Sequence, residues 1–271
     1  MVERIRFFGT SNANPHPDRR QSGVLLDVDG SHYLFDCGDG VASALWNDPE
    51  VCLNSLHAAF FTHRHPDHVG GLPALLLLLH QRIKRSTVVQ PGASTGRELP
   101  SLAAGASEFA AFIPGEQEQA DLFSELADIM HVSNAETAYT KRFYPFMGAG
   151  PVYRDKHVEV SSFPTHHVID SSGFSVLVGE KRIVVSGDIH HPDIVAGVIG
   201  KNHCDVVIIE DAHFPTSEIA ISLAGMDIGT LVVTHRRDDV LEDPGGAMLE
   251  LEPLAGTCEV LLADDGLALV L

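Results

Sequence analysis

The sequence predicts an α/β fold in which short buried strands alternate with helices, and in which side chains that bind metals follow the strands. Three observations lead to this prediction. Apolar, β-branched runs recur along most of the chain, and helical patterns lie between many of them. Several of these runs end at a histidine or an aspartate. With 271 residues, 44% of them hydrophobic, the chain is long enough for one domain over 1–271 with a sizeable core.

The first part of the chain predicts three strands and a helix. The strands are 4–8, 23–28 and 31–35, and Asp29-Gly30 is a hairpin turn between the last two. Asp36 and Asp39 precede a predicted helix that ends near Trp46. Short carboxylates before a helix cap backbone N–H groups, so we expect these two aspartates to cap the helix or to support a neighbouring ligand.

A cluster of three histidines and one aspartate follows the next predicted strand, 56–61. It comprises His63, His65, Asp67 and His68, and a Leu-rich helix with Pro73 in its first turn comes after it. Side chains of an extended turn alternate with period two, so His63 and His65 can reach one metal ion. Asp67 and His68 lie one step further on and can face a second ion about 3.5–4 Å away. A His-rich loop that binds no metal is the alternative.

Three later strands also lead to ligand-type side chains. The predicted strand 158–163 precedes His166 and His167, 182–186 precedes Asp188, and 231–233 precedes His235. Further strands are predicted at 173–178, 205–209, 258–262 and 267–270, and helices at 192–199 and 217–225. Because four strand ends each carry a ligand type, we expect them to converge on one metal site.

The pattern His-x-His-x-Asp-His after a buried strand, with the later histidines and aspartate, resembles the metallo-β-lactamase superfamily over nearly the whole chain. The loop at Gly9 with the following Arg-Ser pair, and the strand ending in Asp-Cys-Gly-Asp-Gly at 36–40, resemble its ribonuclease Z-like branch. That branch contains RNA-processing enzymes, arylsulfatase-like enzymes and small-molecule cyclic phosphodiesterases. The resemblance implies an αββα sandwich of two mixed sheets flanked by helices.

The resemblance also implies a site with two divalent metal ions, zinc first and manganese or iron as alternatives. The implied ligands are His63, His65 and His167 for one ion, Asp67, His68 and His235 for the other, and Asp188 as the bridge. His167 is expected rather than His166, because in this branch the ligand stands six positions before a Gly-aromatic pair, here Gly173-Phe174.

Catalytic roles are less clearly marked in the sequence. Asp67 is expected to hold or deprotonate the nucleophilic water as well as to bind metal. His213 and His191 are the candidates for the histidine that protonates the leaving oxygen, and Glu210 or Asp211 is expected to orient a histidine. A guanidinium at Arg19 or Arg20 suits a substrate phosphate, and a solvated loop arginine is the alternative.

The segment at about 92–150 is predicted to be a helical insertion. A strand at 87–90 precedes it, helices are expected near 102–111 and at 117–130, and an aromatic stretch follows at 139–147. Three roles remain open for this insertion: a lid over the metal cleft, a contact in a homodimer, or a packed helical excursion.

Charge and cysteine usage restrict the partners. The net charge of −19 opposes binding to a long nucleic acid or an anionic membrane. No apolar run reaches membrane-spanning length, and no leader is recognised at Met1. The four cysteines show no paired spacing, which fits a reducing compartment. We therefore expect a cytoplasmic protein.

The predicted function is that of a metal-dependent hydrolase, a phosphodiesterase that cleaves small phosphodiesters, cyclic ones included, with a hydroxide activated by two metals. Transfer-RNA-processing members of the branch carry a long arm between the third histidine and the bridging aspartate, but here His167 and Asp188 are only 21 positions apart. Four alternatives stay open: a lactonase or thioesterase, an RNA-processing nuclease, a flavin-iron oxygen-reducing enzyme, and a member without metals.

Overall fold

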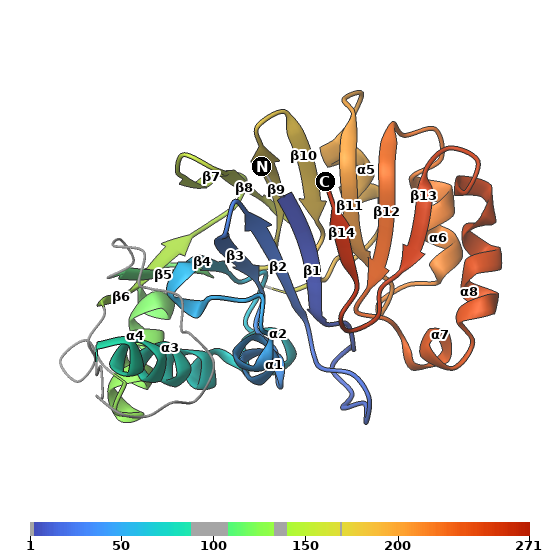
Figure 1. Cartoon of the computed structure of the whole chain (residues 1–271). Coiled ribbons are helices and arrows are strands. Elements are labelled where there is room, and N and C mark those ends of the chain that lie inside the picture. The colour runs from blue at the N-terminus through green and yellow to red at the C-terminus, as the bar shows by residue number, and fades with distance from the viewer. Residues whose placement is uncertain (1–2, 88–107, 133–139, 169) are drawn as a thin grey trace.

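The computed structural model of the chain describes residues 3–87, 108–132, 140–168 and 170–271. Within these residues the strands form two mixed sheets that lie face to face, with helices on the two outer faces (Figure 1). The first sheet has the order β14-β1-β2-β3-β4-β5-β6, and the second has the order β13-β12-β11-β10-β9-β8-β7.

The first sheet is made of β1 (Glu3–Gly9), β2 (Gly23–Val28), β3 (Ser31–Phe35), β4 (Leu56–Phe60), β5 (Glu108–Pro114), β6 (Thr140–Phe146) and β14 (Ala268–Val270). The second is made of β7 (Gly150–Arg154), β8 (Glu159–Pro164), β9 (Ser172–Val178), β10 (Lys181–Val185), β11 (Cys204–Glu210), β12 (Ile228–Thr234) and β13 (Glu259–Leu262). The helices are α1 (Val41–Asn47), η1 (Leu53–Ser55), α2 (Pro66–Val69), α3 (Leu72–Thr87), α4 (Gln117–Ile129), α5 (Asp193–Ile199), α6 (Thr216–Ser222), α7 (Asp238–Glu242), α8 (Pro244–Leu251) and η2 (Glu252–Leu254).

Three apolar cores hold these layers together. The central core lies between the two sheets, where the ring of Phe60 is 5.1 Å from that of Phe35 and 5.8 Å from that of Phe174. A second core joins the first sheet to α1 and α3, and a third joins the second sheet to α5, α6 and α8. Burial of apolar surface on both faces of each sheet gives the four-layered αββα sandwich that the sequence predicts.

The strand directions bring the loops that carry the predicted ligands to one edge of the sandwich. In the first sheet β3 and β4 are parallel neighbours. In the second sheet β10, β11 and β12 are parallel, and β8 runs in the same direction because β9 is antiparallel to both β8 and β10. Carboxyl ends of strands that run in one direction lie at the same edge of a sheet, so the loops after these strands can share one site.

Within the predicted insertion, the helix expected near 102–111 is wrong in its described part. The alanine-rich segment expected as a helix enters β5, where Ala110 and Ala111 are buried between β4 and β6. Small side chains suit this crowded central position, and packing overrides the helix propensity of alanine. The helix at 117–130 is confirmed as α4. A strand was predicted at 87–90, but Thr87 is the last residue of α3. The rest of that predicted strand lies outside the described ranges, and so does the part of the insertion at 92–107.

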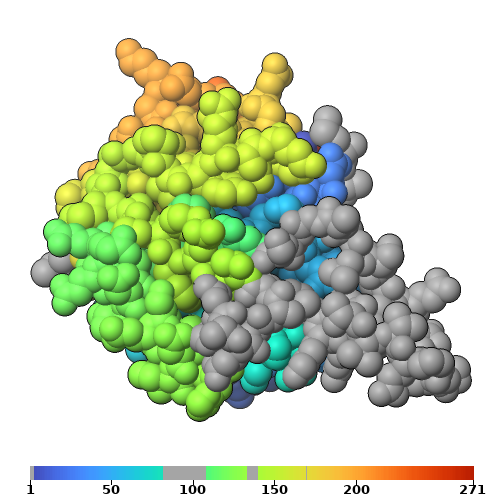
Figure 2. Space-filling view, turned by 90° about the vertical axis from the view of Figure 1, so that its left-hand side faces the viewer, coloured from blue at the N-terminus to red at the C-terminus, as the bar shows by residue number. Residues whose placement is uncertain are grey.

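The aromatic stretch expected at 139–147 forms β6, and its residue 139 lies outside the described ranges. Phe143 packs on the helical side of the sheet, whereas Phe146 packs against the central core. Figure 2 shows this side of the molecule, with residues 108–132 in green below residues 140–168 in lime. On α4, Leu122 and Ile129 are exposed. The lid and the homodimer contact remain predictions. None of the helices in the described part of the chain has the length and apolar character needed to cross a membrane.

Candidate metal centre

The turn between β4 and α2 presents four ligand-type side chains. His63 follows the buried end of β4, and its Nε2 lies 3.0 Å from the Nδ1 of His65. Pro66 begins α2, which fixes the backbone for the next two candidates, because its restricted φ suits a first helical turn. Asp67 and His68 are both buried on this turn, and the His68 Nε2 lies 3.4 Å from a carboxylate oxygen of Asp67.

The loops after β8 and β10 complete a first group of donors. The His167 Nε2 lies 3.4 Å from the Nδ1 of His65 and 3.7 Å from Asp188, and the His63 Nε2 lies 3.6 Å from the same carboxylate. His166 adopts a left-handed backbone with φ 59° and is exposed, so the turn directs its neighbour His167 toward the other histidines. The donor atoms of His63, His65, His167 and Asp188 all lie within 4.8 Å of one another.

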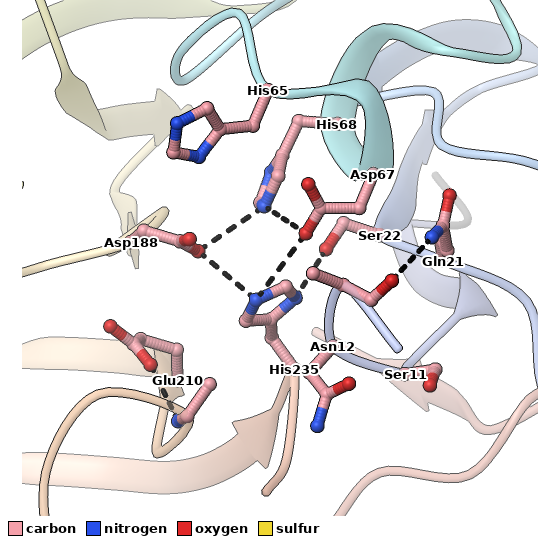
Figure 3. Close-up of polar contacts among 12 residues, drawn as sticks. Ser11, Asn12, Gln21, Ser22, His65, Asp67, His68, Asp188, Glu210 and His235 are labelled. Carbon is pink, nitrogen blue, oxygen red and sulfur yellow. Dashed lines mark hydrogen bonds and ion pairs between the residues drawn. The ribbon is translucent and has the colours of Figure 1, made fainter. Parts of the chain in front are cut away.

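The loop after β12 completes a second group around Asp67, His68 and His235. Figure 3 shows the imidazoles of His68 and His235 between the carboxylates of Asp67 and Asp188. The Nε2 atoms of His68 and His235 lie 3.2 and 3.5 Å from Asp188 Oδ1. Asp188 therefore faces the first group with Oδ2 and the second with Oδ1, which is the arrangement of a shared ligand.

Two buried side chains fix the ring orientation in the second group. Asp36 accepts hydrogen bonds from the His68 Nδ1 at 2.7 Å, from the Thr62 hydroxyl at 2.9 Å and from the Thr62 N–H at 2.8 Å. The Ser22 hydroxyl lies 2.8 Å from the Nδ1 of His235. Partners at Nδ1 leave both Nε2 atoms free to act as donors to a metal.

Several observations indicate that these residues fit metal ions. His68 Nε2 and Asp188 Oδ1 are buried and have no hydrogen-bond partner within the described part of the chain, although they lie 3.2 Å apart. Buried polar atoms without partners are costly, and a cation that both lone pairs face would satisfy them. Ligands about 2.1 Å from a tetrahedral zinc ion lie about 3.4 Å apart, which is close to the spacings found here. Imidazole and carboxylate are also the donor types that zinc prefers.

The electrostatics of the group agree with a bound cation. Burial lowers the pKa of His63 to about 2, so its imidazole is neutral and can donate to a metal. Burial also lowers the pKa of His68, but Asp188 and Asp36 outweigh it and hold the pKa well above the usual range. Burial raises the pKa of Asp67, but the adjacent imidazoles of His68 and His235 bring it to about 2. Positive charge is therefore favoured beside the carboxylates around His68, and a divalent ion supplies it.

Only one of the two candidate proton donors lies in the cluster. The His213 Nδ1 lies 2.8 Å from Glu210, and its Nε2 lies 3.8 Å from Asp188. The hydrogen bond to Glu210 raises the pKa of His213, although burial opposes the shift. The other candidate, His191, has its Nε2 3.2 Å from Glu218 and is not brought to the metal-type donors. Asp211 accepts a hydrogen bond from Thr216 and does not join the group.

A cleft of about 300 Å³ lies over the two groups of donors. Its lining includes Asn12, Ala13, Asn14, His65, Asp67, His167, Asp188, Ala212, His213 and His235. Arg19 and Arg20 are not part of this lining. Arg19 pairs with Asp264 at 2.6 Å and Arg20 with Asp265 at 3.1 Å, so both guanidinium groups are engaged within the protein.

A family model described as "Anti-Pycsar protein Apyc1" matches residues 3–226, which is more than half of the chain. The chain belongs to this family. A ribonuclease Z from Clostridium acetobutylicum is 28% identical to it over 182 residues, which cover 66% of this chain and 50% of that protein. The chain spans about half or less of the length of the first curated relatives that it matches.

Solved structures place this Anti-Pycsar Apyc1 family member among metallo-β-lactamase folds. The metallo-β-lactamase fold protein YhfI from Bacillus subtilis has a TM-score of 0.73 with 16% identity, over the full length of both chains. Human tRNase Z, short form, has a TM-score of 0.70 with 20% identity, over 98% of both chains. The predicted fold and the resemblance to the ribonuclease Z-like branch are thereby confirmed.

The sequence named Asp36 as a possible support for a ligand and Glu210 as a possible partner of a histidine, but it did not identify Thr62 and Ser22 in this family member. Thr62 and Ser22 carry no ligand signature of their own. Ser22 belongs to no metal-ligand pattern in the sequence, and Thr62 is marked only by its place directly before His63. Asn12 lines the cleft, and its amide donates to the Arg236 carbonyl at 2.8 Å and to Asp238 at 2.9 Å, but no motif marks it in the sequence.

Proposed function

We propose that this chain is a metal-dependent phosphodiesterase that uses two divalent ions, zinc first among them, to hydrolyse small phosphodiesters, cyclic ones included. The observation that carries the proposal is the pair of donor groups that share Asp188 beneath one small cleft. His63, His65 and His167 would hold one ion, and Asp67, His68 and His235 the other. Such ions lower the pKa of bound water toward about 7 and offset negative charge on the attacked phosphoryl group.

The protein's own groups have distinct roles in the proposed reaction. Hydrolysis adds water across one P–O bond, so the nucleophile loses a proton and the leaving oxygen gains one. Asp67 stands at the cleft as a carboxylate and is suited to orient the nucleophilic water. His213 also lines the cleft, and Glu210 favours its protonated form, so His213 would protonate the leaving oxygen.

Two features favour a small substrate over a long nucleic acid. Between His167 and Asp188 the described residues form β9 and β10, which are joined by a turn at 179–180, and none of these residues forms an arm. The lining residues named above include neither lysine nor arginine, and the net charge is −19. The flanking phosphates of an RNA would therefore lack cationic partners in the described cleft.

The test is a side-by-side assay of the metal-reconstituted protein. Bis(p-nitrophenyl) phosphate, cyclic mononucleotides, a lactone, a thioester and a precursor transfer RNA would be compared, with Asp188→Asn as the inactive control. Turnover of the diesters with little activity on the others supports the proposal. Efficient RNA cleavage or lactone hydrolysis without diester turnover overturns it.

A further inference from the structure

The proposed histidine ligands differ in how their rings are held. Three of them have a partner at the ring Nδ1: Thr62 at 3.1 Å from His63, Asp36 at 2.7 Å from His68, and Ser22 at 2.8 Å from His235. The Nδ1 of His167 has no hydrogen-bond partner among the described residues. Because such partners normally orient a ligand histidine, the position of His167 must come from its backbone.

The backbone of His167 is fixed by one buried hydroxyl. Ser171 is 5% exposed, and its Oγ accepts the N–H of His167 at 3.0 Å and that of Val168 at 3.2 Å. The same hydroxyl donates to the Val168 carbonyl at 2.8 Å. The Ser171 carbonyl accepts the N–H of Thr165 at 3.2 Å, so this residue ties together both sides of His167.

The turn holds an unfavourable backbone that these contacts offset. His166 and Asp170 have positive φ values of 59° and 66°, which residues other than glycine rarely adopt. The Asp170 carboxylate lies 3.4 Å from the guanidinium of Arg64, the residue between His63 and His65. The ion pair therefore links the turn that carries the third histidine to the turn that carries the first two.

We propose that Ser171 is a positioning residue that sets His167 for metal binding, with the Arg64–Asp170 ion pair as its second support. The inference rests on the proposed two-metal function. Loss of the Ser171 hydroxyl should weaken the binding of one ion only, the ion assigned to His63, His65 and His167. Changes in residues that orient a metal ligand typically cost tenfold to a hundredfold in affinity, so we expect a loss of about tenfold or more.

The experiment is a stepwise zinc titration of the metal-free protein against a chelator, run on matched serine variants. Ser171→Ala should weaken the zinc-binding step that His167→Ala also weakens. The other step, which His235→Ala weakens, should be unchanged in Ser171→Ala. Ser171→Thr, which retains the hydroxyl, should restore most of the affinity. Ser172→Ala is the control, because this adjacent buried serine makes no hydrogen bond through its hydroxyl within the described residues.

The melting temperature of each metal-free variant separates positioning from general stability. The inference is overturned if Ser171→Ala has wild-type affinity at the binding step that His167→Ala weakens. It is also overturned if Ser171→Ala weakens both binding steps equally. If Ser171→Ala fails to fold, Asp170→Asn carries the test, since Asn tolerates the left-handed backbone but removes the ion pair between Asp170 and Arg64. Asp170→Asn should weaken the His167 step severalfold, and unchanged affinity contradicts the inference. Fewer than two ions on the wild type instead count against the proposed function.

Discussion

Asp36 controls which nitrogen of His68 can bind a metal. The carboxylate accepts three buried hydrogen bonds, two from Thr62 and one from the His68 Nδ1. An Asp36→Asn variant keeps one acceptor oxygen and gains an amide donor. If the oxygen stays on the Thr62 N–H, the amide faces the Nδ1 of His68, which must then give up its proton. The imidazole would carry that proton on Nε2 and could no longer donate that atom to a metal.

The magnitude follows from this change of tautomer. Loss of an orienting carboxylate behind a ligand histidine costs about 10- to 100-fold in metal affinity, or roughly 1.4–2.7 kcal/mol. The opposite amide orientation would put two donors against each other near Thr62, which costs about 1–3 kcal/mol for the buried group left unpaired. We therefore expect weaker binding of the ion assigned to Asp67, His68 and His235 and little change in the other ion.

The assay is competition between the protein and a chelator for zinc near pH 7, with each binding step resolved. Asp39→Asn is the matched control, because Asp39 lies three positions further along the chain and its side chain is exposed. Wild-type affinity in Asp36→Asn, or an equal loss in both steps, would refute the argument about the His68 tautomer.

Three further predictions concern the site and the pH dependence of stability. Asp188→Asn should weaken both ions and lower turnover by several orders of magnitude, because one carboxylate offsets the repulsion of two cations; metal analysis and rates check this. His213→Asn should retain the metals and lower kcat by about 10²–10⁴, measured on a diester with a poor leaving group. Burial raises the pKa of Asp211 to about 6. The folded state thus binds its proton between about pH 4 and 6, and stability in the metal-free protein should fall as pH rises through that window, by up to about 3 kcal/mol. Asp211→Asn should remove this slope in urea unfolding.

The convergence of the ligand-bearing loops was predictable from the sequence because its signals are local. A buried β-branched run and the residue after it can be read directly, as at Leu231–Val233 and His235. Parallel strands then bring such residues to one edge of the sheet without further information. The choice of His167 over His166 came from spacing to Gly173 alone, and the structure places His167 beside His65.

Contacts between distant segments could not be predicted in this way. Asp36 was expected either to cap a helix or to support a ligand, and only the fold decides between the two: α1 has Gly40 at its N-cap with no side-chain bond, whereas Asp36 contacts Thr62 and His68. The difference between His213 and His191 depends on which loop turns toward Asp188. At 108–114 the intrinsic propensity of the alanines favours a helix, and the segment is a strand because it pairs with β4 and β6.

The central claim is that two ions and one shared aspartate perform phosphodiester hydrolysis. The most direct measurement is the rate of bis(p-nitrophenyl) phosphate hydrolysis by the metal-free protein as zinc is added in known equivalents. If two ions are needed, the rate should reach its maximum near two equivalents per chain, with Asp188→Asn inactive throughout. A maximum at one equivalent, or no hydrolysis at any zinc level, would contradict it.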